Sequence, residues 1–212
     1  MHIVITGANR GIGWALAERY RAQGREVTGT ARDGSAELQL DVTDPAHQAA
    51  MADQLKGQPV DLLICNAGVY LDKGHSIDDY PAEMWAHSFA ANVTGVFLTI
   101  QSLLPNLRAA GGRIAIMSSQ MASHTRAPGG SYIYRASKAA ALNLGRNLAA
   151  DLKADGIAVG IYHPGWVKTD MGGSAADIHV DQAVAGLMER FDALSLDNTG
   201  CFETYDGKPH AY

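Results

Sequence analysis

Three glycines come directly after the first apolar run of the chain. Residues 2–5 have the character of a buried strand, residues 6–13 (TGANRGIG) follow, and a helical pattern begins near Gly13. Glycine permits a tight turn and lets a pyrophosphate approach the backbone, and the free N–H groups at a helix start attract phosphate. A plain turn is the alternative for such a motif. Its place after the first strand favours a dinucleotide site, with contacts from Gly7, Asn9, Arg10, Gly11, Ile12 and Gly13.

Short apolar runs alternate with longer helical stretches along the whole chain, which is typical of a parallel sheet covered on both faces. Strands are expected at residues 2–5, 26–30, 38–42, 61–65, 112–117, 158–162 and 200–205. Helices are expected at residues 13–23, 44–56, 85–106, 132–154 and 180–191. Residues 33–37 are too few for a helix, so one crossover is expected to be a loop. The sequence predicts one domain over residues 1–212, a Rossmann-type doubly wound parallel sheet of about seven strands with helices on both faces.

The composition of the chain limits the kinds of binding partner and the cellular compartment that we expect. The 212 residues suit one α/β domain, and the net charge of −5 argues against nucleic acid or an anionic membrane as a partner. The eight histidines are scattered without a ligand pattern, so no metal is expected. Two cysteines are too few for a disulfide framework, and the N-terminal run leaves no room for a signal peptide. We therefore expect a cytoplasmic protein with no membrane span.

The end of the second expected strand bears on the choice of cofactor. An acidic residue there would pair with a ribose 2′-hydroxyl, but the chain has Thr30, Ala31 and Arg32. Arg32, with Arg10 nearby, can bind a 2′-phosphate through charge-assisted hydrogen bonds. This favours NADP(H) over NAD(H). Two alternatives stay open: both arginines are simply solvated, or the neighbouring Asp33 weakens the preference.

Tyr134 and Lys138 are four residues apart within an expected helix, which is about one turn. Free tyrosine titrates near pH 10, and a nearby positive charge favours the phenolate. The pair is therefore a candidate acid/base, and the lysine, helped by a cationic cofactor ring, is expected to bring the pKa of Tyr134 toward about 7. Such spacing also arises by chance on helix surfaces. Tyr132 offers no alternative, because the residue four positions after it is Ala136.

Further motifs occur in a fixed order with the glycine turn and the tyrosine–lysine pair. They are LDV at 40–42, CNAG at 65–68, NVTG at 92–95, SS at 118–119, YRASK at 134–138 and PGWVKT at 164–169. With these motifs the chain resembles the short-chain dehydrogenase/reductase family over essentially its whole length. The run at residues 163–173 resembles the small branch of sniffer-type carbonyl reductases and C-factor-like proteins.

The resemblance implies a role for each matching residue. Tyr134 would be the acid/base, Lys138 would bind the ribose, Ser119 would bind the substrate oxygen, and Asn92 would hold a water in a proton relay. Ser118 competes with Ser119 for its role. The implied cofactor contacts, beyond the glycine turn and Arg32, are Asp41, Val42, Asn66, Ala67, Gly68, Tyr134, Lys138, Pro164, Val167 and Thr169.

The resemblance also implies an activity and an assembly. It implies an NAD(P)H-dependent reductase of aldehydes or ketones, with NADPH preferred, that pairs through the helices at 85–106 and 132–154 into a homodimer or homotetramer. A cofactor-binding signalling protein without catalysis is the alternative. The segment after Met171 is short, so we expect an open substrate pocket, with walls from Met121, His124, Tyr132, His163 and Trp166.

Overall fold

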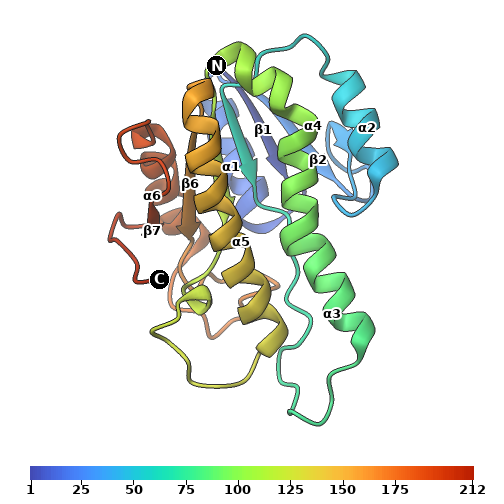
Figure 1. Cartoon of the computed structure of the whole chain (residues 1–212), viewed down its shortest axis with the longest axis vertical. Helices are drawn as coiled ribbons and strands as arrows, with labels where there is room; N and C mark the ends of the chain where they lie inside the picture. The colour runs from blue at the N-terminus through green and yellow to red at the C-terminus, as the bar shows by residue number, and fades with distance from the viewer.

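Seven parallel strands form one sheet at the centre of the structure, a computed structural model that describes residues 1–212 (Figure 1). In spatial order, the strands are β3 (Leu38–Gln39), β2 (Glu26–Ala31), β1 (His2–Thr6), β4 (Leu62–Cys65), β5 (Arg113–Met117), β6 (Ala158–His163) and β7 (Phe202–Thr204). The helices are α1 (Gly11–Ala22), α2 (Pro45–Gln54), α3 (Ala82–Phe89), α4 (Gly95–Ala110), α5 (Tyr132–Leu152) and α6 (Val180–Ala193). The predicted Rossmann-type fold with seven strands is confirmed.

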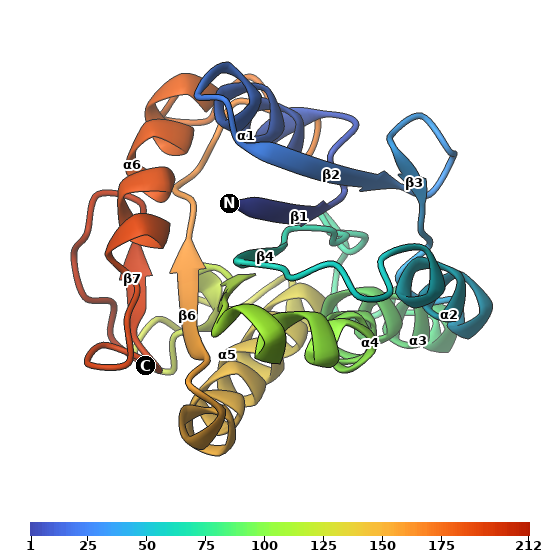
Figure 2. The same cartoon turned by 90° about the horizontal axis from the view of Figure 1, so that it is seen from above.

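Helices cover both faces of the sheet (Figure 2). Side chains alternate along each strand, so Val4 packs with residues of α2, α4 and α5, whereas Ile3 and Ile5 pack with residues of α1 and α6. Two large apolar clusters result, one on each side of the sheet. Burial of apolar side chains in both clusters is the main force that holds the layers together. None of the helices is both long and apolar enough to cross a bilayer.

The strand order reverses at β1, which fixes where a ligand can bind. β1 pairs with β2 on one side and with β4 on the other, and the chain reaches β4 only after β2 and β3. In open parallel sheets, ligands bind at the carboxyl ends of the strands beside such a reversal. The turn after β1 and the turn after β4 both lie at that edge.

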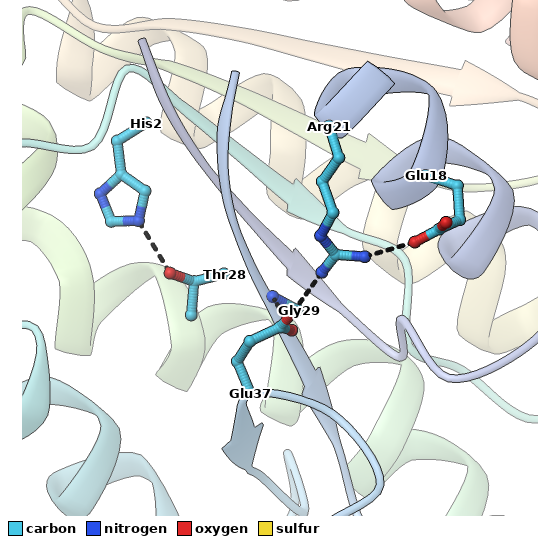
Figure 3. A network of polar contacts seen from close by, with 6 residues as sticks. All are labelled: His2, Glu18, Arg21, Thr28, Gly29 and Glu37. Atoms are coloured by element: carbon cyan, nitrogen blue, oxygen red, sulfur yellow. Dashed lines mark hydrogen bonds and ion pairs between the residues drawn. The ribbon is translucent and has the colours of Figure 1, made fainter. Parts of the chain in front are cut away.

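The β2–β3 connection is a short loop, as expected, but β3 is shorter than the predicted strand at residues 38–42. It ends at Gln39 because the Asp41 carboxylate turns back to accept hydrogen bonds from the Thr43 N–H and hydroxyl, at 2.9 and 2.7 Å. Glu37 supports the connection by accepting the Gly29 N–H of β2 at 2.9 Å (Figure 3). Arg21 of α1 binds both Glu37 and Glu18, which ties this edge of the sheet to α1.

The long helix predicted at residues 85–106 is interrupted. It begins at Ala82 and ends at Ala110, and a π-helical turn, η1 (Ala90–Thr94), separates α3 from α4. Such turns are frequent at functional sites, and Asn92 lies inside this one. Two short 3₁₀ turns, Gln120–Ala122 and Lys153–Asp155, complete the chain's regular structure. Other predicted bounds differ from the observed ones by a few residues at most.

Candidate active site

A cleft of about 280 Å³ opens beside the carboxyl ends of the central strands. Its walls come from the start of α1, the loop after β4, the β5–α5 connection, α5 and the loop after β6. The lining residues are Ile12, Tyr70, Lys73, Ser118, Ser119, Gln120, Met121, Tyr134, His163, Pro164, Gly165, Trp166, Val167, Thr169, Met171 and Gly172. The cleft thus brings Ile12 of the glycine turn together with Ser119 and Tyr134.

Tyr134 and Lys138 share one face of α5, as their spacing predicts. Tyr134 is 9% exposed and Lys138 is 6% exposed. The Lys138 ammonium is 5.7 Å from the centre of the Tyr134 ring and donates a hydrogen bond to the Met117 carbonyl at 2.9 Å. α5 therefore holds a phenol and an ammonium in a site that excludes most water.

The expected lowering of the tyrosine pKa is not observed in this structure. Burial raises the pKa of Tyr134 to about 12, a hydrogen bond from Ser119 opposes the rise, and the charges of Tyr70 and Asp72 add to it. Burial also lowers the pKa of Lys138 to about 8. Desolvation outweighs the neighbouring charge because both groups lie inside the protein. Tyr134 is consequently a protonated donor at neutral pH.

The two neighbouring serines have different partners. The Ser118 hydroxyl donates to the Lys138 backbone carbonyl at 2.9 Å. Ser119 is 6% exposed, its hydroxyl accepts the Met121 N–H at 3.1 Å, and it lies close enough to the Tyr134 phenol to lower the pKa of that group. The geometry therefore favours Ser119 over Ser118 as the partner of a substrate oxygen.

Asn92 uses its whole side chain to hold another segment. Its Oδ1 accepts the Val69 N–H at 2.8 Å, and its Nδ2 donates to the Val69 carbonyl at 2.9 Å and to the Ser137 hydroxyl at 3.0 Å. A Cβ on Gly68 would lie 2.9 Å from Asn92 Oδ1 and 3.4 Å from Lys138 Nζ, so these three residues meet beneath the cleft. The predicted water relay through Asn92 stays a prediction.

The glycine turn has the shape that a pyrophosphate needs. Gly7 and Gly11 have φ of 67° and 57°, and a Cβ on Gly13 would lie 2.1 Å from the Gly7 carbonyl oxygen. Asn66 Nδ2 donates to the carbonyls of Thr6 and Gly7, each at 3.0 Å. No side chain caps the start of α1 and its first turn has no acidic residue, so its N–H groups remain free for an anion. Asn66 thus supports the glycine turn, and the cofactor contacts predicted for residues 66–68 stay predictions.

The loop after β6 lies over the glycine turn. Thr169 Cγ2 is 3.5 Å from the place of a Gly11 Cβ, and Thr169, Val167 and Pro164 all line the cleft. Arg10 pairs with the exposed Asp170 of this loop at 2.7 Å, so its guanidinium points across the glycine turn and not toward Arg32. The predicted nicotinamide contacts and the predicted phosphate contacts are therefore adjacent.

The predicted cofactor contacts Arg32, Asp41 and Val42 lie at the end of β2 and just after β3. Partial burial acts to raise the pKa of Asp41, but hydrogen bonds from Thr43, and then the charge of the exposed Arg32, lower it below its usual value. Hydrogen bonds from Ser35 hold the pKa of Asp33 below its usual value, and Asn9 donates to Asp33 at 3.3 Å. Val42 is buried in the core with its side chain toward Gly95.

Comparison with known proteins shows the family to which the chain belongs. The family model "short chain dehydrogenase" matches residues 1–178. The chain belongs to the short-chain dehydrogenase family. Its relatives include the C-signal protein of Myxococcus xanthus, which is 36% identical over 160 residues that cover 74% of this chain and 96% of that protein.

Two solved structures of this family show the same architecture over the whole chain. The NADPH-bound carbonyl reductase from chicken fatty liver is 31% identical, with a TM-score of 0.91 over 100% of this chain and 98% of that chain. The carbonyl reductase Sniffer of D. melanogaster is 27% identical, with a TM-score of 0.93 over 100% of this chain and 99% of that chain. The predicted resemblance to sniffer-type reductases and C-factor-like proteins is confirmed.

The lining of the cleft differs in part from the prediction for this short-chain dehydrogenase. Met121, His163 and Trp166 line the cleft, but His124 and Tyr132 do not. The Tyr132 ring packs instead against Tyr80 at 5.5 Å between ring centres. Six lining residues were not predicted as contacts or walls, namely Tyr70, Lys73, Gln120, Gly165, Met171 and Gly172. Tyr70 and Lys73 come two and five residues after the Asn-Ala-Gly turn, and this was the one available signal for them.

Proposed function

We propose that this short-chain dehydrogenase reduces the carbonyl group of aldehydes or ketones with NADPH. The observation that carries the proposal is the placement of Tyr134 and Ser119 together in a cleft that begins at the glycine turn. The NADPH-bound carbonyl reductase, similar to this chain over its whole length, supports the same cofactor. The nicotinamide ring, when bound, supplies the hydride.

The chain's own residues would handle the charge on the substrate oxygen. Ser119 and Tyr134 offer two hydroxyl donors toward one carbonyl oxygen, where negative charge develops as the carbon is reduced. Tyr134 would give its proton to that oxygen. Lys138 would bind the ribose hydroxyls, and Pro164, Val167 and Thr169 would orient the nicotinamide. Fixing both reactants face to face contributes about 7–11 kcal/mol in favourable cases.

Burial raises the pKa of Tyr134 in the cofactor-free protein and keeps its phenol protonated. This is the form that can give a proton to a carbonyl oxygen, as reduction requires.

The substrate class follows from the lining of the cleft. The walls are aromatic and aliphatic around Tyr70, Met121, Trp166 and Met171, and no carboxylate lines the cleft. No helix covers it, because residues 168–179 run as a loop that is held by the Trp166 Nε1 bond to the Gly172 carbonyl at 2.9 Å. An open apolar cleft suits varied aldehydes and ketones with a hydrophobic substituent.

A homodimer or homotetramer is part of the proposal. Trp85 of α3 and Phe97 of α4 are 37% and 39% exposed, which is high for large apolar side chains. Trp85 stacks with Phe89 at 6.1 Å between ring centres. A second copy that packs on α3, α4 and α5 would cover these rings.

Loss of NADPH absorbance with a panel of aldehydes, ketones and quinones tests the function. Wild-type protein should turn over part of the panel, and Tyr134→Phe should lose at least about a hundredfold in rate. Tyr132→Phe is the matched control, because Tyr132 lies outside the cleft on the same helix. Tight NADPH binding without turnover would favour the non-catalytic signalling alternative.

A further inference from the structure

A buried carboxylate sits at the start of the helix that carries Tyr134. Asp72 is 0% exposed, although aspartate is almost never fully buried without partners. Its Oδ2 accepts the Ile133 N–H at 2.9 Å, and its two carboxylate oxygens lie 3.3 and 3.4 Å from the Tyr134 nitrogen. The free N–H groups and the positive end of the α5 dipole therefore stabilise the charge.

The residues just before α5 do not cap it themselves. Ser131 occupies the cap position with φ of 49° and ψ of 43°, and its side chain makes no hydrogen bond to the helix. A left-handed conformation is uncommon for serine. The Ser131 hydroxyl instead pairs with the Tyr70 hydroxyl at 2.5 Å. Asp72, 61 residues away from Ile133 in sequence, supplies the missing cap.

Asp72 belongs to a short stretch, residues 69–72, which we call the clamp segment. Asn92 holds Val69 through both its N–H and its carbonyl. The Tyr70 ring stacks on the Tyr134 ring, with 4.2 Å between centres and 20° between planes. The clamp segment thus joins the π-helical turn around Asn92 to the first turn of α5.

We propose that Asp72 is a positioning residue: by capping α5 from the clamp segment, it fixes the Tyr134 phenol against Tyr70 and Ser119. The inference rests on the proposed function, because it gives Tyr134 the proton-donor role. Tyr134 is only the third residue of α5, and helix ends without caps fray. A misplacement of about 1 Å in a catalytic group can cost about a hundredfold in rate.

The charge of Asp72 adds a second effect on Tyr134. The groups that face the phenol are Asp72 and Tyr70 from the clamp segment, Ser119 from the β5–α5 connection and Lys138 from α5 itself. Asp72 and Tyr70 both act to raise the pKa of Tyr134, in the same direction as burial. Removal of the Asp72 charge should therefore move the alkaline limb of the activity toward lower pH.

Asp72→Ala and Asp72→Asn, with Asp78→Asn as an exposed control in the same loop, test the role. Asp72→Ala removes the cap, so kcat should fall roughly tenfold to a hundredfold while KM for NADPH changes little. Asp72→Asn keeps a neutral acceptor for the Ile133 N–H, so it should retain more of the rate. Its alkaline limb should lie below that of the wild type. Asp78→Asn should match the wild type in all three measurements.

Wild-type kcat and an unshifted alkaline limb in Asp72→Asn, together with unchanged kcat in Asp72→Ala, would overturn the proposal. A loss confined to KM for NADPH would also overturn it. If Asp72→Ala does not fold, the test rests on the alkaline limb of the pH–activity profile of Asp72→Asn.

Hydrogen exchange at the amides of Ile133 and Tyr134 separates this proposal from the function. These amides should be protected in the wild type and exchange faster in Asp72→Ala, or in Asp72→Asn if the alanine variant does not fold. Protection with no turnover would contradict the proposed function alone. Rapid exchange of these amides in an active wild-type enzyme would contradict the capping role of Asp72 alone.

Discussion

The hydroxyl groups of the adjacent residues Ser118 and Ser119 point to different sides of the chain and have different hydrogen-bond partners. Ser118 donates to the backbone carbonyl of Lys138 at 2.9 Å, which ties the end of β5 to α5. The Ser119 hydroxyl instead accepts the Met121 N–H at 3.1 Å and lies near the Tyr134 phenol. Extended backbone at this point directs successive side chains to opposite sides, so Ser118 braces the helix and Ser119 is the serine that we propose as the partner of the substrate oxygen.

The serines should therefore respond differently to alanine. Ser119→Ala removes a donor from the substrate oxygen, and we expect kcat to fall about a hundredfold. Ser118→Ala should show the smaller loss of kcat and the larger loss of thermal stability, about 1 kcal/mol for one hydrogen bond. Steady-state kinetics and thermal unfolding of both variants check this. Equal losses of kcat would contradict the assignment.

Gly13→Ala should weaken nucleotide binding. The new Cβ would lie 2.1 Å from the Gly7 carbonyl oxygen and 2.5 Å from Asn66 Nδ2, so the turn would have to open. We expect the Kd for NADPH to rise at least about tenfold, which corresponds to about 1.4 kcal/mol. Gly57→Ala is the control, because its φ of 77° makes alanine unfavourable there but its Cβ would meet no neighbour within 4 Å. Calorimetric titration with NADPH should show normal binding for the control.

The sequence was sufficient to predict the sheet, since each strand is a short apolar run and the glycine turn identifies the edge where ligands bind. It could not predict the π-helical turn at Asn92, because nothing in the helical spacing of residues 85–106 marks an extra residue. Nor could it predict Asp72, whose partners are backbone groups 61 residues away. In the cofactor-free protein burial raises the pKa of Tyr134, and the sequence could not predict this because local spacing does not report burial.

Lys138→Met should make the protein more stable and inactive. Burial lowers the pKa of Lys138 to about 8, so at pH 7 the fold pays for a buried charge. The full cost is at most about 3 kcal/mol, and loss of the bond to the Met117 carbonyl offsets part of it. We expect a net gain of about 1–2 kcal/mol in the free energy of unfolding of the cofactor-free protein at pH 7.

The gain should depend on pH in a defined sense. Between pH 8 and 10.5 the unfolded wild type binds more protons at this lysine than the folded protein does. The contribution of Lys138 to the free energy of unfolding of the wild type therefore rises with pH across that window. Lys138→Met has no such change, because methionine does not titrate. The advantage of the variant should shrink as pH rises from 8 to 10.5. Urea unfolding of both proteins at several pH values measures it, and a growing advantage would contradict the burial argument.

Arg32→Ala should change the choice between cofactors. Arg32 is exposed at the end of β2, where a guanidinium can hold a 2′-phosphate through two hydrogen bonds. Arg10 is paired with Asp170 at 2.7 Å and is less available for this phosphate. We expect kcat/KM for NADPH to fall by roughly tenfold to a hundredfold, as for the loss of one charge-assisted contact, and kcat/KM for NADH to stay nearly constant.

Two further measurements make the Arg32 prediction decisive. The preference of the wild type for NADPH should weaken as salt is raised, because the contact is exposed and screened over about 10 Å at 0.1 M ionic strength. Arg10→Ala should lower kcat/KM for both cofactors alike, since its pair with Asp170 joins the glycine turn to the loop after β6. If Arg32→Ala lowered NADPH and NADH turnover equally, Arg32 would act on the fold of the β2 end. The acidic Asp33, held in place by Ser35 and Asn9, would then be the residue to examine for ribose binding.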